Sequence, residues 1–269
     1  MSRRILLIGR GSMLGQGLTA AHHGELVAHP HSVDLSSIDF DAFDAVLNMA
    51  HPPAYRREVY LAANDTDLAV AHAIKAQGAK RPRLYLMSSR KVYGDHGGIP
   101  VGEDAELRAS DAYGRNKIIT EREVASLLGE QCTIFRIGNV FDFEPGRASF
   151  FGIALSRLAE RDEILLDCSP FTTRDFIPLA DCARIILSLV ERDAQGVINL
   201  GSGQSTAVGR IALWIIEGFG RGRLVSDSPV EKDAFALDVG RLVSEIGPVE
   251  CDVRARCHEI GEKLAWNAS

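Results

Sequence analysis

Two side chains in the middle of the chain stand at a spacing that suits proton transfer. Tyr113 and Lys117 are four residues apart at the start of a predicted helix, so they lie on one face about one turn apart. A free tyrosine titrates at about pH 10 and is a poor base at neutral pH. A close ammonium group favours the phenolate form, which can exchange a proton with a substrate hydroxyl or carbonyl group. Taken alone, the pair also fits a solvated helix face with a partly buried ring.

A third side chain, Ser89, strengthens the catalytic interpretation. It follows the apolar run at residues 83–87, which predicts a strand that ends next to it. Open α/β sheets bind ligands beyond the carboxyl ends of their strands, and a hydroxyl group there could donate to the oxyanion that develops at a carbonyl. The alternative is a serine that caps a turn. Ser89, Tyr113 and Lys117 together are the predicted catalytic residues.

A glycine-rich turn follows the first apolar run, at residues 5–8, and opens a predicted helix. Glycines permit torsions and close approaches that side chains would block, and the helix N-terminus presents unpaired N–H groups to a pyrophosphate. Its place between a strand and a helix distinguishes this turn from an ordinary tight turn. The predicted dinucleotide-binding residues of the turn are Gly9, Arg10, Gly11, Ser12, Met13, Leu14 and Gly15.

The end of the second predicted strand bears on the choice of cofactor. An acidic residue there would bind the ribose 2′-hydroxyl of NAD, whereas a basic residue favours the 2′-phosphate of NADP. Residues 28–31 contain no carboxylate, and Arg10 could reach a phosphate. NADP is therefore preferred to NAD, and Asp34 and Leu35 are expected beside the adenine.

The elements that must position these residues alternate between short apolar runs and longer helical stretches, as in a βαβ chain. The runs are apolar on both faces, which parallel strands covered by helices on each side require. We therefore predict an α/β fold, a Rossmann-type doubly wound parallel sheet with a small C-terminal substrate-binding lobe. Helices are predicted over residues 12–22, 55–77, 112–128, 149–160, 179–191 and 207–218, and strands over 3–9, 25–29, 44–50, 83–89, 131–137, 163–166 and 196–201. A glycine-broken link at 218–223 and two short helices are expected to follow.

The expected domains are discontinuous. The dinucleotide-binding domain comprises residues 1–142 and 171–202, and the substrate-binding lobe comprises 143–170 and 203–269.

Composition excludes several classes of function. The hydrophobic share of 46% and the charged share of 25% are those of an ordinary globular protein. The net charge of -6 and the absence of a basic stripe argue against nucleic acid as a partner. The N-terminus has too short an apolar run for a signal peptide or a bilayer span, so no membrane association and a cytoplasmic location are expected.

The five cysteines form no C-x-x-C pair, which indicates reduced thiols. Cys251, Cys257 and His258 cluster in the sequence but supply too few spaced ligands, so no metal site is predicted.

These segments, in this order, resemble the extended short-chain dehydrogenase/reductase family, also called the NAD-dependent epimerase/dehydratase family. Residues 43–50 resemble the strand before the family's nicotinamide pocket, and residues 133–141 and 174–177 resemble segments that face the substrate. The resemblance implies cofactor contacts from Met49, Ala50, His51 and Asn64, and substrate contacts from Ser89, Asn139 and Arg174. It also implies that Tyr113 is the acid/base, Ser89 the polarising hydroxyl and Lys117 the ribose-binding cation.

The chain departs from the family pattern in two places. The usual G-x-x-G-x-x-G spacing has Ser12 in the middle position, and a helix and a strand of larger members are missing after the second strand. The trimmed form is similar to dTDP-4-dehydrorhamnose reductases and related 4-ketosugar reductases. Sugar dehydratases have Thr-Asp-Glu where this chain has Ser89-Arg90-Lys91, so the acid needed to protonate a leaving hydroxyl is absent and dehydration is disfavoured.

The resemblance thus implies an NAD(P)-dependent oxidoreductase that reduces the 4-keto group of a nucleotide-activated deoxysugar. The alternatives are an NAD-dependent nucleotide-sugar 4-epimerase and a non-catalytic NAD(P)-binding sensor. Family members often dimerise through helices that correspond here to residues 55–77 and 112–128, so the resemblance also allows a homodimer.

Overall fold

The central sheet is parallel throughout. The structure is a computed structural model that describes residues 3–268, and within them the sheet has six strands in the order β10-β6-β4-β3-β1-β2. After β2 the chain crosses to the other side of β1 to form β3, and ligands bind at such reversals in doubly wound sheets. The predicted Rossmann-type fold is confirmed. The strands are β1 (Ile5–Ile8), β2 (Leu26–His29), β3 (Ala45–Asn48), β4 (Arg83–Ser89), β6 (Cys132–Ile137) and β10 (Gly196–Leu200).

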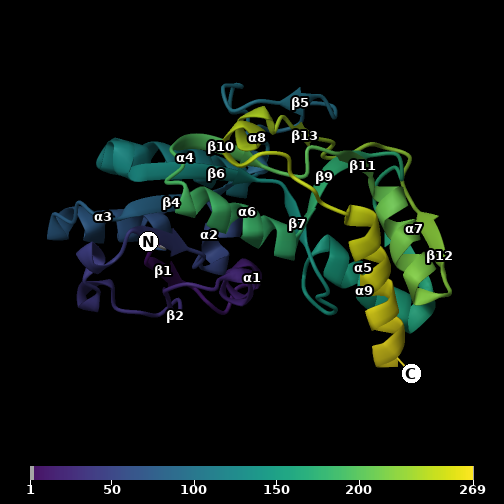
Figure 1. Cartoon of the computed structure of the whole chain (residues 1–269). Coiled ribbons are helices and arrows are strands. Elements are labelled where there is room, and N and C mark those ends of the chain that lie inside the picture. Colours follow the sequence, from purple (N-terminus) through teal and green to yellow (C-terminus); the bar gives the residue numbers. More distant parts are fainter. Residues whose placement is uncertain (1–2, 269) are drawn as a thin grey trace.

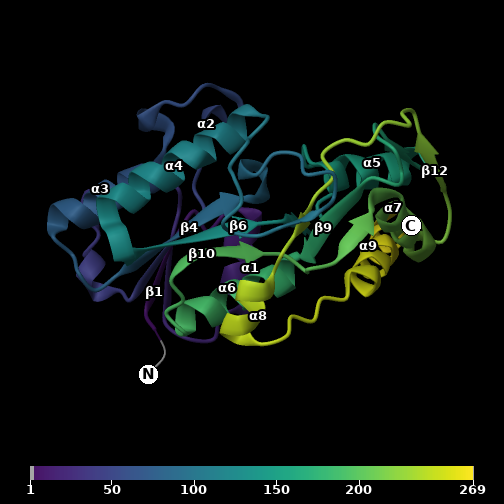
Figure 2. The same cartoon turned by 90° about the horizontal axis from the view of Figure 1, so that it is seen from above.

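Helices cover both faces of the sheet (Figures 1 and 2). On one face α1 (Met13–Ala21) packs against α6 (Leu179–Glu191), and on the other α3 (Thr66–Gln77) packs against α4 (Ala112–Leu128). The buried side chains of the two faces belong to separate hydrophobic clusters. Helices α4 and α6 begin and end at the predicted residues, because their apolar periodicity is bounded by clear capping or strand residues.

The prediction of one continuous helix over residues 55–77 was wrong. The segment forms α2 (Pro53–Arg57), a 3-10 turn η3 (Ala62–Asn64) and then α3. Asp65 interrupts it, because its carboxylate accepts a hydrogen bond from the N–H of Leu68 at 3.0 Å and so caps a new helix. The break sends α2 back towards α4 (Figure 2).

The short connection between β2 and β3 contains two 3-10 turns, η1 (Leu35–Ser37) and η2 (Phe40–Ala42), and no further strand. Another 3-10 turn, η4 (Arg90–Val92), directly follows β4. A further one, η5 (Gly129–Gln131), directly follows α4.

A second assembly lies at one end of the molecule (Figure 1). There α7 (Val208–Phe219) packs against the long helix α9 (Val253–Ala268), and α5 (Phe150–Arg161) contacts α9 as well. The strand β8 (Glu163–Leu166) was predicted, but it pairs with β12 (Arg223–Ser226) and not with the central sheet.

Two expectations about the C-terminal part need correction. The glycine-broken link predicted over residues 218–223 leads directly into β12, because the apolar pair Leu224 and Val225 follows it and the segment pairs with β8. Of the two helices expected to be short, α8 (Gly240–Ile246) is short and contacts β10 and α6, whereas α9 is 16 residues long. The remaining strands are β5 (Pro100–Val101), β7 (Asn139–Phe141), β9 (Thr173–Pro178), β11 (Ser205–Ala207) and β13 (Ala236–Leu237).

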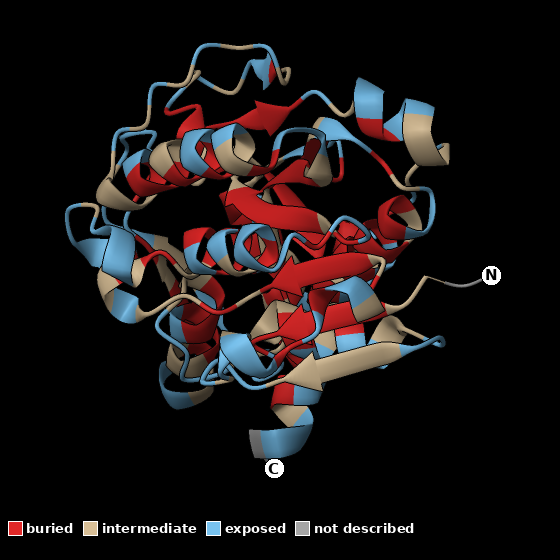
Figure 3. Cartoon of the chain, turned by 90° about the vertical axis from the view of Figure 1, so that its left-hand side faces the viewer, coloured by how far each residue is buried: buried red, intermediate tan, exposed pale blue. Residues whose placement is uncertain are grey.

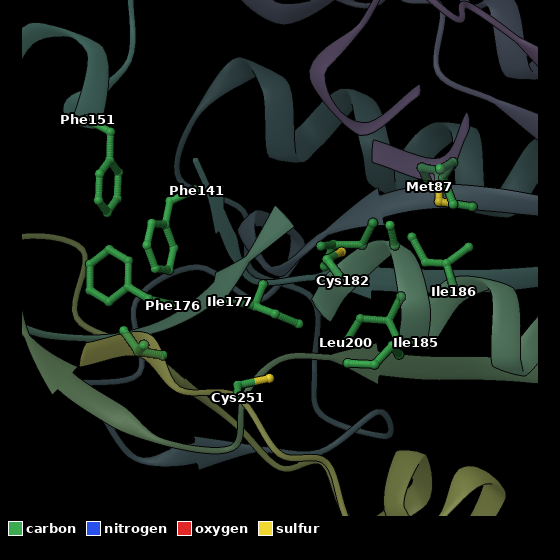
Figure 4. Packing of buried hydrophobic residues seen from close by; sticks show 14 of the residues in the cluster. Met87, Phe141, Phe151, Phe176, Ile177, Cys182, Ile185, Ile186, Leu200 and Cys251 are labelled. Carbon is green, nitrogen blue, oxygen red and sulfur yellow. The ribbon is translucent and has the colours of Figure 1, made fainter. Parts of the chain in front are cut away.

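One hydrophobic cluster joins the sheet to this second assembly. Figure 3 shows the buried strands of the central sheet between helices whose outer faces are exposed. Figure 4 shows Phe141, Phe151 and Phe176 gathered at one end of the cluster and Met87 at the other. Phe141 stacks on Phe151 at 4.7 Å between ring centres, and Phe176 meets both rings edge-on. The two parts of the molecule therefore share a continuous core.

The turn after β10 is fastened to β9 by one buried carboxyl group. Asp175 accepts hydrogen bonds from the N–H and hydroxyl of Ser202, both at 2.8 Å, and from the N–H of Gly203 at 3.0 Å. A Cβ atom at Gly201 would lie 2.4 Å from its Oδ2 atom. Burial raises the pKa of Asp175 from 3.8 to about 6, and the hydrogen bonds offset this only in part.

This raised pKa predicts a pH dependence of stability. The native protein holds a proton on Asp175 that the unfolded chain releases, so its stabilising effect is fully present below pH 3.8 and is lost as the pH rises to about 6. In urea denaturation, the difference in unfolding free energy between wild type and Asp175→Asn should fall over this interval, by at most about 1.4 kcal/mol per pH unit. A difference that stays constant over this interval would contradict the raised pKa.

Candidate active site

The glycine turn lies at the reversal point beside β1. Gly9 has a φ of 85°, and a Cβ atom there would lie 2.8 Å from the backbone nitrogen of Ala50. A Cβ atom at Gly15 would lie 2.6 Å from the carbonyl oxygen of Gly9, whereas the position of Gly11 is open. The first and last positions of the family's glycine pattern therefore have a steric reason to be glycine here.

Ser12 occupies the middle position of that pattern as the N-cap of α1. Its hydroxyl oxygen accepts a hydrogen bond from the N–H of Gly15 at 3.0 Å. The next two residues, Met13 and Leu14, line a cavity together with Ser12. The turn and this cavity fit a dinucleotide, because the residues that open α1 line the cavity and the N-terminus of a helix favours a pyrophosphate.

Arg10 lies beside the end of β2, as the cofactor argument requires. The backbone N–H groups of Gly9 and Arg10 both donate to the carbonyl oxygen of His29, at 3.0 and 3.1 Å. Arg10 is exposed, and no carboxylate follows His29 directly. Asp34 is exposed too and caps η1 by accepting a hydrogen bond from the N–H of Ser36 at 3.0 Å, with Leu35 in the same turn.

The cavity beyond the turn has a volume of about 700 Å³ and continues to the carboxyl end of β4. It brings together half of the predicted site residues. The predicted residues that line it are Ser12, Met13, Leu14, Met49, His51, Ser89, Tyr113, Asn139 and Arg174.

Gly114 lets the helix that carries Tyr113 lie close to the turn that follows Ser89. A Cβ atom at Gly114 would lie 2.5 Å from the carbonyl oxygen of Lys91, in the turn that follows Ser89. The absence of a side chain thus lets α4 approach η4 closely. Asp111 fixes the start of α4 by accepting a hydrogen bond from the N–H of Gly114 at 2.8 Å. Ser89 and Tyr113 both line the one cavity.

Lys117 is held away from that cavity by two buried partners. Its side chain has no exposed area, and its Nζ atom donates to Asp67 Oδ2 at 3.1 Å and lies 2.9 Å from His51 Nε2. His51 Nε2 is 3.0 Å from the same carboxylate oxygen, and Asn48 donates to the other one at 2.8 Å. Of the cluster Lys117, Asp67 and His51, it is His51 that lines the cavity.

Charge in this cluster is distributed by burial and mutual attraction. Burial would raise the pKa of Asp67, but the charge of Lys117 and the hydrogen bonds from His51 and Asn48 outweigh it and hold that pKa well below its usual range. Burial would lower the pKa of Lys117, yet the carboxylate raises it. Burial and repulsion from Lys117 lower the pKa of His51. The cluster is therefore an ammonium and carboxylate pair beside a neutral imidazole.

Two predicted cofactor residues, Ala50 and Asn64, do not line the cavity. Ala50 is buried, and its N–H donates to Asn48 Oδ1 at 3.1 Å. Asn64 ends the turn η3 and is half-buried.

Sequence reasoning did not single out Asp67, Arg56 or Asp233. Asp67 reads as an ordinary acidic residue in the first turn of a helix, and its partner Lys117 is 50 positions away. Asp233 accepts hydrogen bonds from Arg90 and Lys91 across more than 140 residues. An acidic residue on an inward helical position is the only local signal that could have indicated Asp67.

Residues 3–268 contain neither a cluster of metal-ligating side chains nor a helix suited to span a membrane. No three His, Cys, Asp or Glu side chains gather there in an arrangement that could hold a metal ion. None of the helices in this part of the chain combines the length and the apolar character needed to cross a membrane.

Comparison with known proteins places the chain in a family. The model of the NAD dependent epimerase/dehydratase family matches residues 17–201. A protein of Methanocaldococcus jannaschii named "Putative UDP-glucose 4-epimerase" is 24% identical over 231 residues, which cover 81% of this chain and 75% of that protein. A dTDP-4-dehydro-6-deoxy-D-allose reductase from Streptomyces sp is 26% identical over 176 residues, covering 59% and 53%.

The fold has close structural counterparts. The NAD dependent NDP-hexosamine 5,6-dehydratase TunA superimposes with a TM-score of 0.80 at 19% identity, over 99% of this chain and 98% of that one. The predicted resemblance is thereby confirmed: the chain belongs to the NAD dependent epimerase/dehydratase family and is an enzyme of the short-chain dehydrogenase/reductase type.

Proposed function

We propose that this enzyme reduces a carbonyl group of a nucleotide-activated sugar, at the 4-keto position, with the deoxysugars expected from the sequence among its candidate substrates. The observation that carries the proposal is that Ser89 and Tyr113 line the same cavity that begins at the glycine turn. A carbonyl held between them lies within reach of a nicotinamide whose pyrophosphate is at residues 12–14. When bound, the cofactor supplies the hydride.

The protein's own groups handle the proton. Tyr113 donates its phenolic proton to the carbonyl oxygen while the carbonyl carbon accepts the hydride. Ser89 donates a hydrogen bond to the same oxygen and stabilises the charge that develops on it. His51 contacts Lys117 and Asp67 and lines the cavity where the nicotinamide ribose would lie. Asn139 and Arg174, which also line the cavity, are the proposed substrate contacts.

NADP is the proposed cofactor, with NAD as the alternative. Arg10 is exposed beside the end of β2 and has no carboxylate neighbour there to compete with a 2′-phosphate. Dehydration is disfavoured, because Arg90 and Lys91 stand where an acid would be needed and both are ion-paired with Asp233.

The proposal is tested by following NADPH consumption with a panel of nucleotide 4-ketosugars, including deoxysugars. Turnover of at least one of them is expected, and NADH should be used less well. Binding of NADPH without turnover of any member would support a non-catalytic sensor instead.

A 4-epimerase is the second candidate, and the name of the M. jannaschii relative favours it. An epimerase would use the same Ser89 and Tyr113 but return the hydride to the opposite face of the sugar. It would copurify with tightly bound NAD and interconvert two nucleotide sugars without net cofactor consumption.

Replacing Ser89 by alanine should lower kcat by about 10²- to 10³-fold, because one donor to the developing oxyanion is lost. Ser89→Thr keeps the hydroxyl and should retain most of the activity. The measurement is steady-state turnover on the best substrate of the panel. Equal activity of Ser89→Ala and wild type would remove Ser89 from the mechanism.

A further inference from the structure

Arg56 places a guanidinium group beside the proposed acid/base. This exposed residue of α2 lines the cavity, and its Cζ atom lies 5.5 Å from the centre of the Tyr113 ring. A substrate oxygen that Tyr113 can reach is therefore also close to the positive charge of Arg56.

The backbone that carries Arg56 is fixed to the helix that carries Tyr113. Asn116 on α4 is buried, and its amide donates to the carbonyl oxygens of Tyr55 at 2.8 Å and Glu58 at 3.0 Å, on either side of Arg56. The buried Tyr55 hydroxyl also lies 2.6 Å from Thr120 Oγ1 on the same helix. Arg56 is thus presented to the cavity from a fastened turn.

The other cations that line the cavity are already engaged. Arg90 and Lys91 both pair with Asp233, and Arg147 pairs with Glu144 at 2.5 Å. Their charges are compensated within the protein, so they add little net attraction for an anion.

Arg174 is engaged as well, through the carbonyl oxygens of Lys232 at 2.8 Å and Asp233 at 3.2 Å. Among residues 3–268, no carboxylate forms an ion pair with Arg56, whose guanidinium group lies over the ring of Tyr113. In the described part of the chain, Arg56 is the cavity-lining cation without an acceptor of its own. Such a charge is suited to an anionic group that arrives with the substrate.

We infer that Arg56 binds a carboxylate on the sugar ring, so that the substrate is a nucleotide-linked sugar acid. The inference rests on the proposed function, in which Tyr113 serves the oxygen at C4. In a hexopyranose the carboxylate of a uronic acid is attached at C5, next to C4, whereas the diphosphate is attached at C1 on the opposite side of the ring. C3, the other ring carbon next to C4, carries a neutral hydroxyl group in a hexuronic acid, so an anion close to both Tyr113 and Arg56 is the C5 carboxylate, in place of the methyl group of a 6-deoxysugar. The planar guanidinium can bind it through two parallel hydrogen bonds.

The test compares equilibrium binding of glucuronic acid and glucose, each linked to UDP and to dTDP, to the protein saturated with NADPH. The cofactor is then in its reduced form and C4 of each sugar carries a hydroxyl group, so no hydride transfer consumes the complex. Wild type should bind the glucuronic acid compound about tenfold or more tightly than the glucose compound. Arg56→Ala should lower the affinity for the glucuronic acid compound by roughly 10- to 100-fold. The affinity for the glucose compound should change less than about twofold. Arg56→Lys should keep part of the preference.

Arg57→Ala is the matched control, because it removes the same charge from the next residue of α2, which does not line the cavity. It should leave both affinities unchanged. Equal affinity of wild type for the two sugars, or an equal loss for both in Arg56→Ala, would overturn the carboxylate assignment while leaving the proposed function intact. Failure of every nucleotide sugar to bind would overturn both.

Discussion

Replacing Tyr113 by phenylalanine is expected to lower turnover by about 10²- to 10⁴-fold, the usual contribution of a positioned acid/base. The variant loses only the phenolic hydroxyl. Its ring still packs edge-on against Tyr55, at 6.3 Å between ring centres, and still lies beside Arg56. The measurement is kcat with the best nucleotide sugar, alongside NADPH affinity by fluorescence, which should change little.

Tyr60→Phe provides the matched control for this experiment. Tyr60 donates its hydroxyl to Asp65 at 2.9 Å and does not line the cavity, so its loss should leave kcat near the wild-type value. If Tyr113→Phe turns over as fast as Tyr60→Phe, another group must supply the proton.

The largest expected effect on stability comes from separating Lys117 from its carboxylate. Asp67→Leu leaves an ammonium group with no exposed area and without its counter-charge. Breaking a buried pair from one side typically costs about 3–5 kcal/mol. Urea denaturation should show this loss as a lower midpoint, and the neighbouring neutral His51 cannot restore it.

The double variant Asp67→Leu/Lys117→Met tests whether the cost arises from the unpaired charge. An apolar pair of similar volume removes the buried charge altogether, so the double variant should recover much of the stability lost in Asp67→Leu. If the loss of stability in the double variant equals the sum of the losses in Asp67→Leu and Lys117→Met, the two side chains are not coupled.

The sequence predicted the elements whose signal is local. The runs at β1, β3, β4 and β6 are apolar on both faces, and only a sheet covered on both sides buries them. The glycine turn and the Tyr113 segment were recognisable because their geometry depends on neighbouring residues, such as Gly114 beside the turn after β4.

The features that the sequence did not predict depend on contacts between distant segments. The break after α2 is held by Asn116, about 60 positions farther along the chain. The pairing of β8 with β12 joins strands about 60 residues apart, and neither strand carries a signal for its partner. The withdrawal of Lys117 from the cavity requires Asp67, whose spacing from it has no periodic signature. Only the folded chain brings these groups together.

The three phenylalanines beneath the cavity have a consequence for engineering specificity by recombination. Phe141 ends β7, Phe176 lies on β9 and Phe151 is in the first turn of α5, and all three pack in one cluster (Figure 4). A chimaera whose crossover points fall at residues 142/143 and 170/171 would cut this aromatic stack between two parental sequences. Exchange of the proposed substrate-binding lobe between relatives must therefore carry its Phe141 and Phe176 counterparts along, or these side chains that line the cavity will be repacked.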